Sequence, residues 1–198
     1  MGEDVGEEMG ADLGAGLGGV AQDDLETLCA KAALRTLVSR YSRAVDRRDL
    51  DMLRGLYAPD AFDHHGGMYE GGVDGYIAFL RRALARYEAT THYVLQCDFH
   101  VDGARAEGEV HKINYHREAS DPQIEVVTGS RSLDQYIRRE GRWYFQSRVI
   151  TLDWVRRRPV DPAAYQDFAA NSPLGRAGPE DPSFAALPLL CRELAGLF

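Results

Sequence analysis

An aspartate and a histidine stand where a folded domain could bring their side chains together. Asp46 ends a stretch with helical apolar spacing, so its carboxylate should lie near the core-facing side. His92 opens a strand-like stretch. A histidine with an unperturbed pKa near ~6.5 is a usable base at neutral pH, and a carboxylate on its other ring nitrogen fixes the tautomer. The plainer alternative is an ion pair of Asp46 with Arg47 or Arg48 and a structural role for His92.

Three further side chains could assist such a pair. Tyr41 precedes Asp46 on the same helical stretch, and His116 lies in a strand-like stretch of mixed polarity. Arg148 lies inside an apolar last strand, where it needs a partner, and Asp153 or a substrate oxygen could serve. Tyrosine and arginine can stabilise developing negative charge, and a histidine can transfer a proton, so all three are candidate catalytic residues.

Polar side chains on two neighbouring strands indicate a cavity or a subunit interface. Alternation with a period of two places every second residue of a strand on one face. One face of residues 105–117 mixes apolar and polar side chains, and the next strand gathers hydroxyl groups on one face. A cavity with a polar lining favours an oxygenated ligand. The residues expected to line this cavity and bind the substrate are Asp63, Val110, Lys112, Asn114, Thr128, Ser130 and Ser132.

The remaining histidines do not form a metal-binding pattern. Asp63-His64-His65 contains ligand-type side chains, and so does the pair His111 and His116. Residues 111 and 116 differ by an odd number, so they would face opposite sides of a strand. The chain also lacks a P-loop, a GxGxxG motif after a strand and an HExxH helix. We therefore expect no metal and no organic cofactor.

The elements that must position these side chains change from helices to strands near residue 90. Apolar residues recur with helical spacing over 25–45, over a short segment that Asp49 should cap, and over 73–87. Alternation then predicts strands at 91–101, 105–117, 124–138 and 142–154, after a glycine-rich, turn-rich connection at 66–72. Helices followed by an antiparallel meander predict an α+β fold, with the helices on one face of a curved sheet.

Composition divides the 198 residues into a tail, a domain and an arm. The net charge of −8 belongs to residues 1–30, which hold acids and no lysine or arginine. Residues 1–22 should be a disordered, acidic, Gly-rich tail, residues 23–158 the domain, and residues 159–198 a Pro-rich arm with a short helix near 189–197. The sequence shows no membrane span and no secretory signal, so we expect a cytoplasmic protein. The cysteines should be reduced and buried: Cys29, Cys97 and Cys191.

The order of the candidate residues resembles a known superfamily. Tyr-x4-Asp ends the first helix, Thr-His-Tyr begins the next strand, a histidine lies in mid-sheet and an arginine lies on the last strand. This pattern is similar to the nuclear transport factor 2-like superfamily, specifically its SnoaL-like branch, over residues 24–155. The resemblance implies a cone-shaped α+β barrel, with three N-terminal helices packed in the concave face of a strongly curved antiparallel or mixed sheet.

The resemblance also implies roles for individual residues. Asp46 and His92 fall at the dyad of the branch, and Arg148 falls at the cavity arginine of hexachlorocyclohexane dehydrochlorinase and bile acid 7α-dehydratase. Tyr41 matches a tyrosine of the bile acid enzyme, and His116 matches the second histidine of scytalone dehydratase. Two departures imply a different substrate. Ser132 stands where scytalone dehydratase has asparagine, and Lys112 stands where the dehydrochlorinase is apolar.

These roles combine into an expected activity, a cofactor-independent lyase. His92, held by Asp46, would abstract a proton while Tyr41 and Arg148 stabilise negative charge and His116 acts as general acid. A small oxygenated aromatic or polycyclic substrate would lose water, or a carbonyl fragment such as formaldehyde. The alternatives are an isomerase or cyclase of the same superfamily, or a non-catalytic ligand-binding or assembly module.

The expected partners follow from the surface. Outward groups on the open sheet face, such as Arg131, Leu133 and Gln135, suggest a homodimer or homotrimer. The domain itself is balanced in charge, and its one basic run, 156–158, lacks interleaved aromatic residues and should pair with acids of the C-terminal arm. We therefore expect no nucleic acid and no membrane among the partners.

Overall fold

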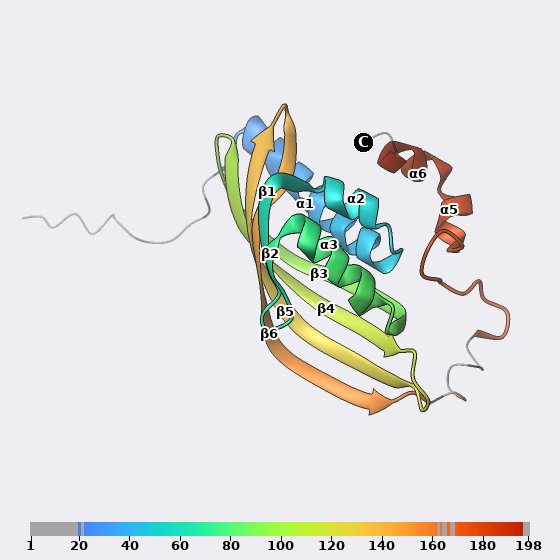
Figure 1. The fold of residues 1–198 in the computed structure, drawn as a ribbon. Helices are drawn as coiled ribbons and strands as arrows, with labels where there is room; N and C mark the ends of the chain where they lie inside the picture. Colours follow the sequence, from blue (N-terminus) through green and yellow to red (C-terminus); the bar gives the residue numbers. More distant parts are fainter. Residues whose placement is uncertain (1–19, 21, 162, 164–165, 167–168, 196–198) are drawn as a thin grey trace, which may run out of the picture.

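The computed structural model describes residues 20, 22–161, 163, 166 and 169–195. The predicted tail lies almost entirely outside these residues. Three helices and two short strands come first (Figure 1): α1 (Leu25–Asp46), α2 (Leu50–Gly55), β1 (Tyr57–His64), β2 (Glu70–Gly72) and α3 (Val73–Leu84). Four long strands and two short helices follow: β3 (Tyr87–Asp102), β4 (Arg105–Glu118), β5 (Ile124–Arg139), β6 (Arg142–Pro159), α5 (Pro182–Ala186) and α6 (Pro188–Ala195).

Side-chain caps fix where the first two helices begin. Asp24 accepts a hydrogen bond from the backbone N–H of Thr27 at 2.7 Å, and Asp49 accepts one from Met52 at 3.0 Å. Between the helices, Arg48 adopts a φ of 58°, in the left-handed region, which turns the chain sharply after Asp46. The cap at Asp49 was predicted, and the turn is what holds Asp46 at the very end of α1.

The connection after α2 contains two strands that the sequence analysis did not predict. α2 ends at Gly55, and Tyr57 is the first residue of β1. β2 is only three residues long and pairs with the end of β1. The alternation in β1 is masked because two adjacent positions, 59 and 60, are both exposed. The glycine-rich composition of 66–72 suggested an irregular connection, whereas the chain between α2 and α3 contains two paired strands.

The sheet is mixed and strongly curved. Its strand order is β2-β1-β6-β5-β4-β3, with β1 parallel to β6 and every other pair antiparallel. Helices α1, α2 and α3 lie against its concave face, and the core forms between them, as expected (Figure 1). The ends of β4, β5 and β6 extend beyond the helices, which leaves part of the concave face uncovered (Figure 1).

The C-terminal arm packs beside the last turns of α1. The guanidinium of Arg43 lies 5.3 Å from the ring centroid of Phe184 and donates to Oγ of Ser183 at 3.2 Å. Arg47 forms an ion pair with Asp181 at 3.2 Å. The short helix predicted near 189–197 corresponds to α6. None of the described helices is both long and apolar enough to cross a membrane.

Two surface expectations were wrong. In the basic run, Arg157 pairs with Glu118 of β4 and Arg158 pairs with Glu125 of β5, rather than with acids of the arm, because the sheet brings these side chains together before the arm begins. Cys29 is exposed, since it lies on the outer side of α1, while the other two cysteines are partly buried; all three are free.

Candidate active site

The aspartate and histidine singled out in the sequence are hydrogen-bonded to each other. Nδ1 of His92 in β3 lies 2.7 Å from Oδ1 of Asp46, and the backbone N–H of His92 donates to Oδ2 at 2.9 Å. Only 14% of the His92 side chain and 10% of the Asp46 side chain are exposed. Because a carboxylate accepts hydrogen bonds, the proton belongs on Nδ1. Among the described residues none hydrogen-bonds Nε2, so this nitrogen has a free lone pair.

A second layer of hydrogen bonds orients the carboxylate. The hydroxyl of Thr90 donates to Oδ1 of Asp46 at 2.9 Å. Arg48 in turn donates to the Thr90 oxygen at 2.9 Å and to the backbone oxygen of Val45 at 2.8 Å. Since Thr90 accepts from Arg48, its own proton must point toward Asp46. Asp46 therefore forms an ion pair with neither Arg47 nor Arg48, which was the plainer alternative. Its carboxylate is hydrogen-bonded to His92 and Thr90 instead.

His116 lies beside the pair but is not bonded to it. Its ring centroid is 5.4 Å from that of His92, with the two planes at 86°, and Tyr87 contacts its other side at 4.9 Å. Burial, together with the neighbouring His92, lowers the pKa of His116 to about 4. His116 is therefore a neutral imidazole at pH 7.

Cross-strand pairing extends the site over the concave face. Residues directly opposite each other on neighbouring strands share a face. His92 is opposite Asn114, Asn114 is opposite Thr128, and Thr128 is opposite Val155. The adjacent row on the same face consists of Val94, Lys112, Ser130 and Leu152. Val155 and Leu152 are 52% and 62% exposed, so an apolar floor stays open next to the polar side chains.

Asn114 links three of the predicted binding residues. Its Nδ2 donates to Oγ1 of Thr128 at 3.1 Å and to Oγ of Ser130 at 2.8 Å. Its Oδ1 is buried and has no hydrogen-bond partner among the described residues. The neighbour of His92 thus offers an unused acceptor, whereas Thr128 and Ser130 serve mainly to hold it.

Arg148 has a different partner from the one we expected. Its Nε and Nη2 donate to the two carboxylate oxygens of Asp134 at 2.8 and 3.0 Å, and Nη2 also lies 3.3 Å from Oγ of Ser132. Asp153 instead contacts Arg131 on the outer face. Because Asp153 faces the opposite side of β6 from Arg148, it cannot pair with it.

Tyr41 and Asp63 belong to a second hydrogen-bonded network. The hydroxyls of Tyr41 and Tyr76 are 2.5 Å apart, and the Tyr76 hydroxyl is 3.2 Å from Nε2 of His65. Nδ1 of His65 is 2.5 Å from Oδ1 of Asp63, whose Oδ2 accepts from Tyr57 at 2.6 Å. Both oxygens of Asp63 are therefore occupied, and its predicted role in substrate binding loses its support.

Lys112 and Val110 lie deeper in the concave face. Val110 is fully buried and packs in the core. Lys112 is 5% exposed, and its Nζ lies 5.1 Å from the ring centroid of Tyr41. Burial, together with the positive charge of Arg148, lowers the pKa of Lys112 to about 7.

Six residues of these networks were not among the predicted site residues: Arg48, Tyr57, His65, Tyr76, Thr90 and Asp134. Period-two spacing could have found two of them, since Thr90 precedes His92 by two residues and Asp134 lies between Ser132 and Tyr136 on their shared face. His65 and Tyr76 carry no such signal, because their positions depend on β1 and α3 packing together.

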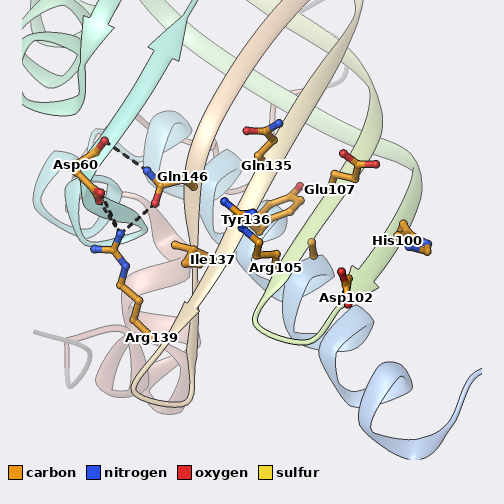
Figure 2. A pocket seen from close by; sticks show the side chains of 11 residues that line it. Asp60, His100, Asp102, Arg105, Glu107, Gln135, Tyr136, Ile137, Arg139 and Gln146 are labelled. Atoms are coloured by element: carbon orange, nitrogen blue, oxygen red, sulfur yellow. Dashed lines mark hydrogen bonds and ion pairs between the residues drawn. The ribbon is translucent and has the colours of Figure 1, made fainter.

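Two hollows on the surface differ in their relation to the pair. One, of about 440 Å³, lies between α1 and β3 and is lined by Asp46 and His92 together with Ser42 and Arg43. The other, of about 600 Å³, is shown in Figure 2 with α1 behind the sheet. Its wall includes Asp60, Arg139 and Gln146 and no predicted site residue, so size alone does not identify the site.

The described residues contain no group of three His, Cys, Asp or Glu side chains placed to hold a metal ion. The candidate site consists of an oriented histidine, an arginine–aspartate pair and a buried lysine around a concave face. This arrangement, on a curved sheet covered by three helices, defines a nuclear transport factor 2-like protein.

The comparison with known proteins agrees with this class. The family model described as a SnoaL-like domain matches residues 26–149, and the chain belongs to this family. An uncharacterized protein of Mycobacterium tuberculosis is 28% identical over 122 residues, which is 60% of this chain and 82% of the relative.

Solved structures show the same fold at low identity. Hexachlorocyclohexane dehydrochlorinase LinA-type3 from Novosphingobium barchaimii has a TM-score of 0.63 and 20% identity, over 71% of this chain and 96% of that one. A provisionally assigned scytalone dehydratase of Novosphingobium aromaticivorans has a TM-score of 0.61 and 17% identity, over 68% and 91% of the two chains.

Proposed function

We propose that the protein is a cofactor-independent lyase with His92 as its base. The observation that carries this proposal is the 2.7 Å hydrogen bond between Nδ1 of His92 and Asp46, which leaves Nε2 free to take a proton. Asp46 holds the tautomer and stabilises the imidazolium that forms. The names of two similar proteins, a dehydrochlorinase and a dehydratase, denote eliminations, which supports this class of reaction.

In the proposed step, Nε2 of His92 removes a proton from a carbon next to the one that bears a hydroxyl. The electron pair of the broken C–H bond forms a C=C bond, the C–O bond breaks, and the hydroxyl leaves as water with the proton that His92 returns. The base, its orienting carboxylate and the charge-stabilising groups are all side chains, so the step itself uses no cofactor.

Arg148 and Tyr41 are proposed to stabilise the negative charge that develops on the substrate. Arg148 is fixed by Asp134, so it needs no reorganisation at the moment of reaction. His116 was expected to act as the general acid, but its lowered pKa argues against an imidazolium at neutral pH. We propose instead that His116 acts as a neutral hydrogen-bond donor beside His92.

The substrate is proposed to be an oxygenated cyclic or aromatic compound on the concave face. Leu152 and Val155 offer apolar contact, while Asn114 presents an unpartnered oxygen to a hydroxyl group. The same base could release a carbonyl fragment from a hydroxylated substrate, or return the proton to another carbon. Product masses separate these outcomes, because only dehydration lowers the mass by one water.

The test is a comparison of two histidine variants on a panel of hydroxylated aromatic and polycyclic compounds, monitored by mass spectrometry. His92→Ala should lower the turnover of any accepted substrate by about 100-fold or more, because the base is lost. His111→Ala is the matched control, since His111 lies on the outer face beside Glu109. A loss in His92→Ala no larger than that in His111→Ala would remove His92 as the base.

A further inference from the structure

Lys112 is buried without a hydrogen-bonding or ionic partner. It is 5% exposed, and no described residue accepts a hydrogen bond from its ammonium group. Its Nζ lies over the Tyr41 ring, 5.1 Å from the ring centroid. A buried lysine is rare unless paired, because removing its charge from water is unfavourable. Lys112 therefore carries N–H donors for which no described residue is an acceptor.

Arg148 adds a second set of unused donors beside the same ring. Its Nη1 is buried and has no hydrogen-bond partner among the described residues, although Nε and Nη2 are bonded. Its guanidinium carbon lies 4.0 Å from the ring centroid of Tyr41. Arg148 also reaches Ser132, which lies next to the cross-strand row of Lys112 and Ser130. The two cations thus flank one aromatic ring.

The buried acids nearby cannot supply the missing acceptor. Asp134 accepts hydrogen bonds from Arg148 through both oxygens and from Tyr136 through Oδ2. Asp63 is bonded through one oxygen to Tyr57 and through the other to His65. The unused donors of Lys112 and Arg148 therefore find no free carboxylate among these described acids, and an anionic oxygen of a ligand would satisfy them.

We propose that Lys112 and Nη1 of Arg148 bind an anionic oxygen of the substrate, which makes the substrate a carboxylic acid or an ionisable phenol or enol. This inference rests on the proposed function only in taking the concave face as the substrate site. Lys112 is paired with Val94 of β3, and Val94 is two residues from His92 on the same face of that strand. An anionic group bound at Lys112 would therefore anchor a substrate near the base.

The site also couples binding to protonation. Burial, and then the charge of Arg148, hold the pKa of Lys112 at about 7, so it is part neutral at neutral pH. A bound anion favours the ammonium form and should raise this pKa by about one unit or more. The charged and titratable groups that act on Lys112 come from five elements, and they are Tyr41, Asp63, Cys97, Asp134 and Arg148.

The first measurement is binding of three probes of similar size by calorimetry. Benzoate and the phenolate form of 4-nitrophenol carry an anionic oxygen, and benzamide does not. Benzoate should bind at least about ten-fold more tightly than benzamide, with proton uptake at pH 8. Tighter binding of the phenolate than of benzoate would identify the phenol or enol class, and the reverse order the carboxylic acids. Equal binding of benzoate, phenolate and benzamide would overturn the proposal.

The second measurement uses the fact that the chain has only two lysines, Lys31 and Lys112. Carbon-13 labelling of lysine gives one titrating signal for each, and Lys31, which pairs with Asp23 on the surface, is the internal control. The tighter-binding anion should raise the titration midpoint of Lys112 and leave that of Lys31 unchanged. An unchanged Lys112 midpoint in the presence of bound anion would contradict the assignment.

Matched variants separate this site from the proposed catalysis. Lys112→Met should lose the preference for anions by about ten-fold or more, while Lys31→Met should keep it. In His92→Ala the preference should persist even if all turnover is lost, because the anion site does not include the base. Selective binding of anions without any turnover would support the anion site and contradict the proposed lyase activity. Turnover in Lys112→Met with unchanged affinity for anions would support the lyase activity and contradict the anion site.

Discussion

Two aspartate–histidine pairs lie inside this domain, and they are built differently. Asp46 and His92 come from α1 and β3, 46 residues apart in the chain, with 2.7 Å between Oδ1 and Nδ1. Asp63 and His65 are two residues apart at the end of β1, with 2.5 Å between the same two atoms. A search for short aspartate–histidine contacts would not distinguish them.

The second ring nitrogen separates the two pairs. Nε2 of His65 lies 3.2 Å from the hydroxyl of Tyr76, whose ring stacks on the imidazole at 4.8 Å. Burial keeps the pKa of His65 below its ordinary value despite the nearby Asp63, so the ring stays neutral and fully bonded. His92, by contrast, has no described partner at Nε2. A hydrogen-bonded histidine can act as a base only when its other nitrogen is unoccupied.

The largest expected effect comes from replacing the two aspartates in parallel. Asp46→Asn should lower turnover by about 10⁴-fold, because an amide favours the wrong tautomer of His92. Asp63→Asn should instead lower the free energy of unfolding by about 2–3 kcal/mol, since Tyr57 and His65 lose an acceptor in a fully buried position. Kinetics and urea denaturation of both variants check this contrast.

One outcome would contradict this difference between the two aspartates. If Asp63→Asn loses turnover as strongly as Asp46→Asn while its free energy of unfolding is unchanged, then the pair at β1 takes part in catalysis. His65→Gln provides the control, because it removes the ring that stacks on Tyr76 without changing the carboxylate.

His116 predicts a specific loss of stability in acid. Its pKa is about 4 in the folded chain, against ~6.5 when unfolded, so between these values only the unfolded state takes up the proton. Stability from this residue is therefore complete above pH 6.5 and falls as the pH drops toward 4, by up to about 3 kcal/mol. His116→Asn should flatten the dependence of the unfolding free energy on pH in that window, whereas His111→Asn, on the exposed face, should not.

A smaller effect is expected from the threonine that orients Asp46. Thr90→Val keeps the shape of the side chain, removes the donor to Asp46 and leaves Arg48 without one acceptor. Turnover should fall by about ten-fold, the size of one hydrogen bond to a charged group. Thr90→Ser, which retains the hydroxyl, should recover most of this loss. An unchanged rate in Thr90→Val would show that the backbone N–H of His92 is sufficient to hold the carboxylate.

The features that the sequence predicted depend on neighbouring residues in the chain. Helical spacing located the first helix, and helical spacing with the cap at Asp49 located the second, because capping and amphipathicity are local properties. Period-two alternation placed Asn114 and Thr128 on one inward face, which the cross-strand pairing confirms. The strand that the sequence did not predict, β1, was missed for a local reason too, because its alternation of buried and exposed residues is irregular.

The sequence by itself thus determined the three N-terminal helices, the four long strands with their faces, and the candidates for acid–base chemistry. Only the tertiary structure decided which partner each charged side chain took. Arg148 pairs with Asp134 because β5 and β6 place them directly opposite each other, and Asp63 is occupied because α3 packs Tyr76 against His65. Such choices depend on strand pairing and helix packing between distant segments, and a buried donor or acceptor takes whichever partner that packing brings within hydrogen-bond distance.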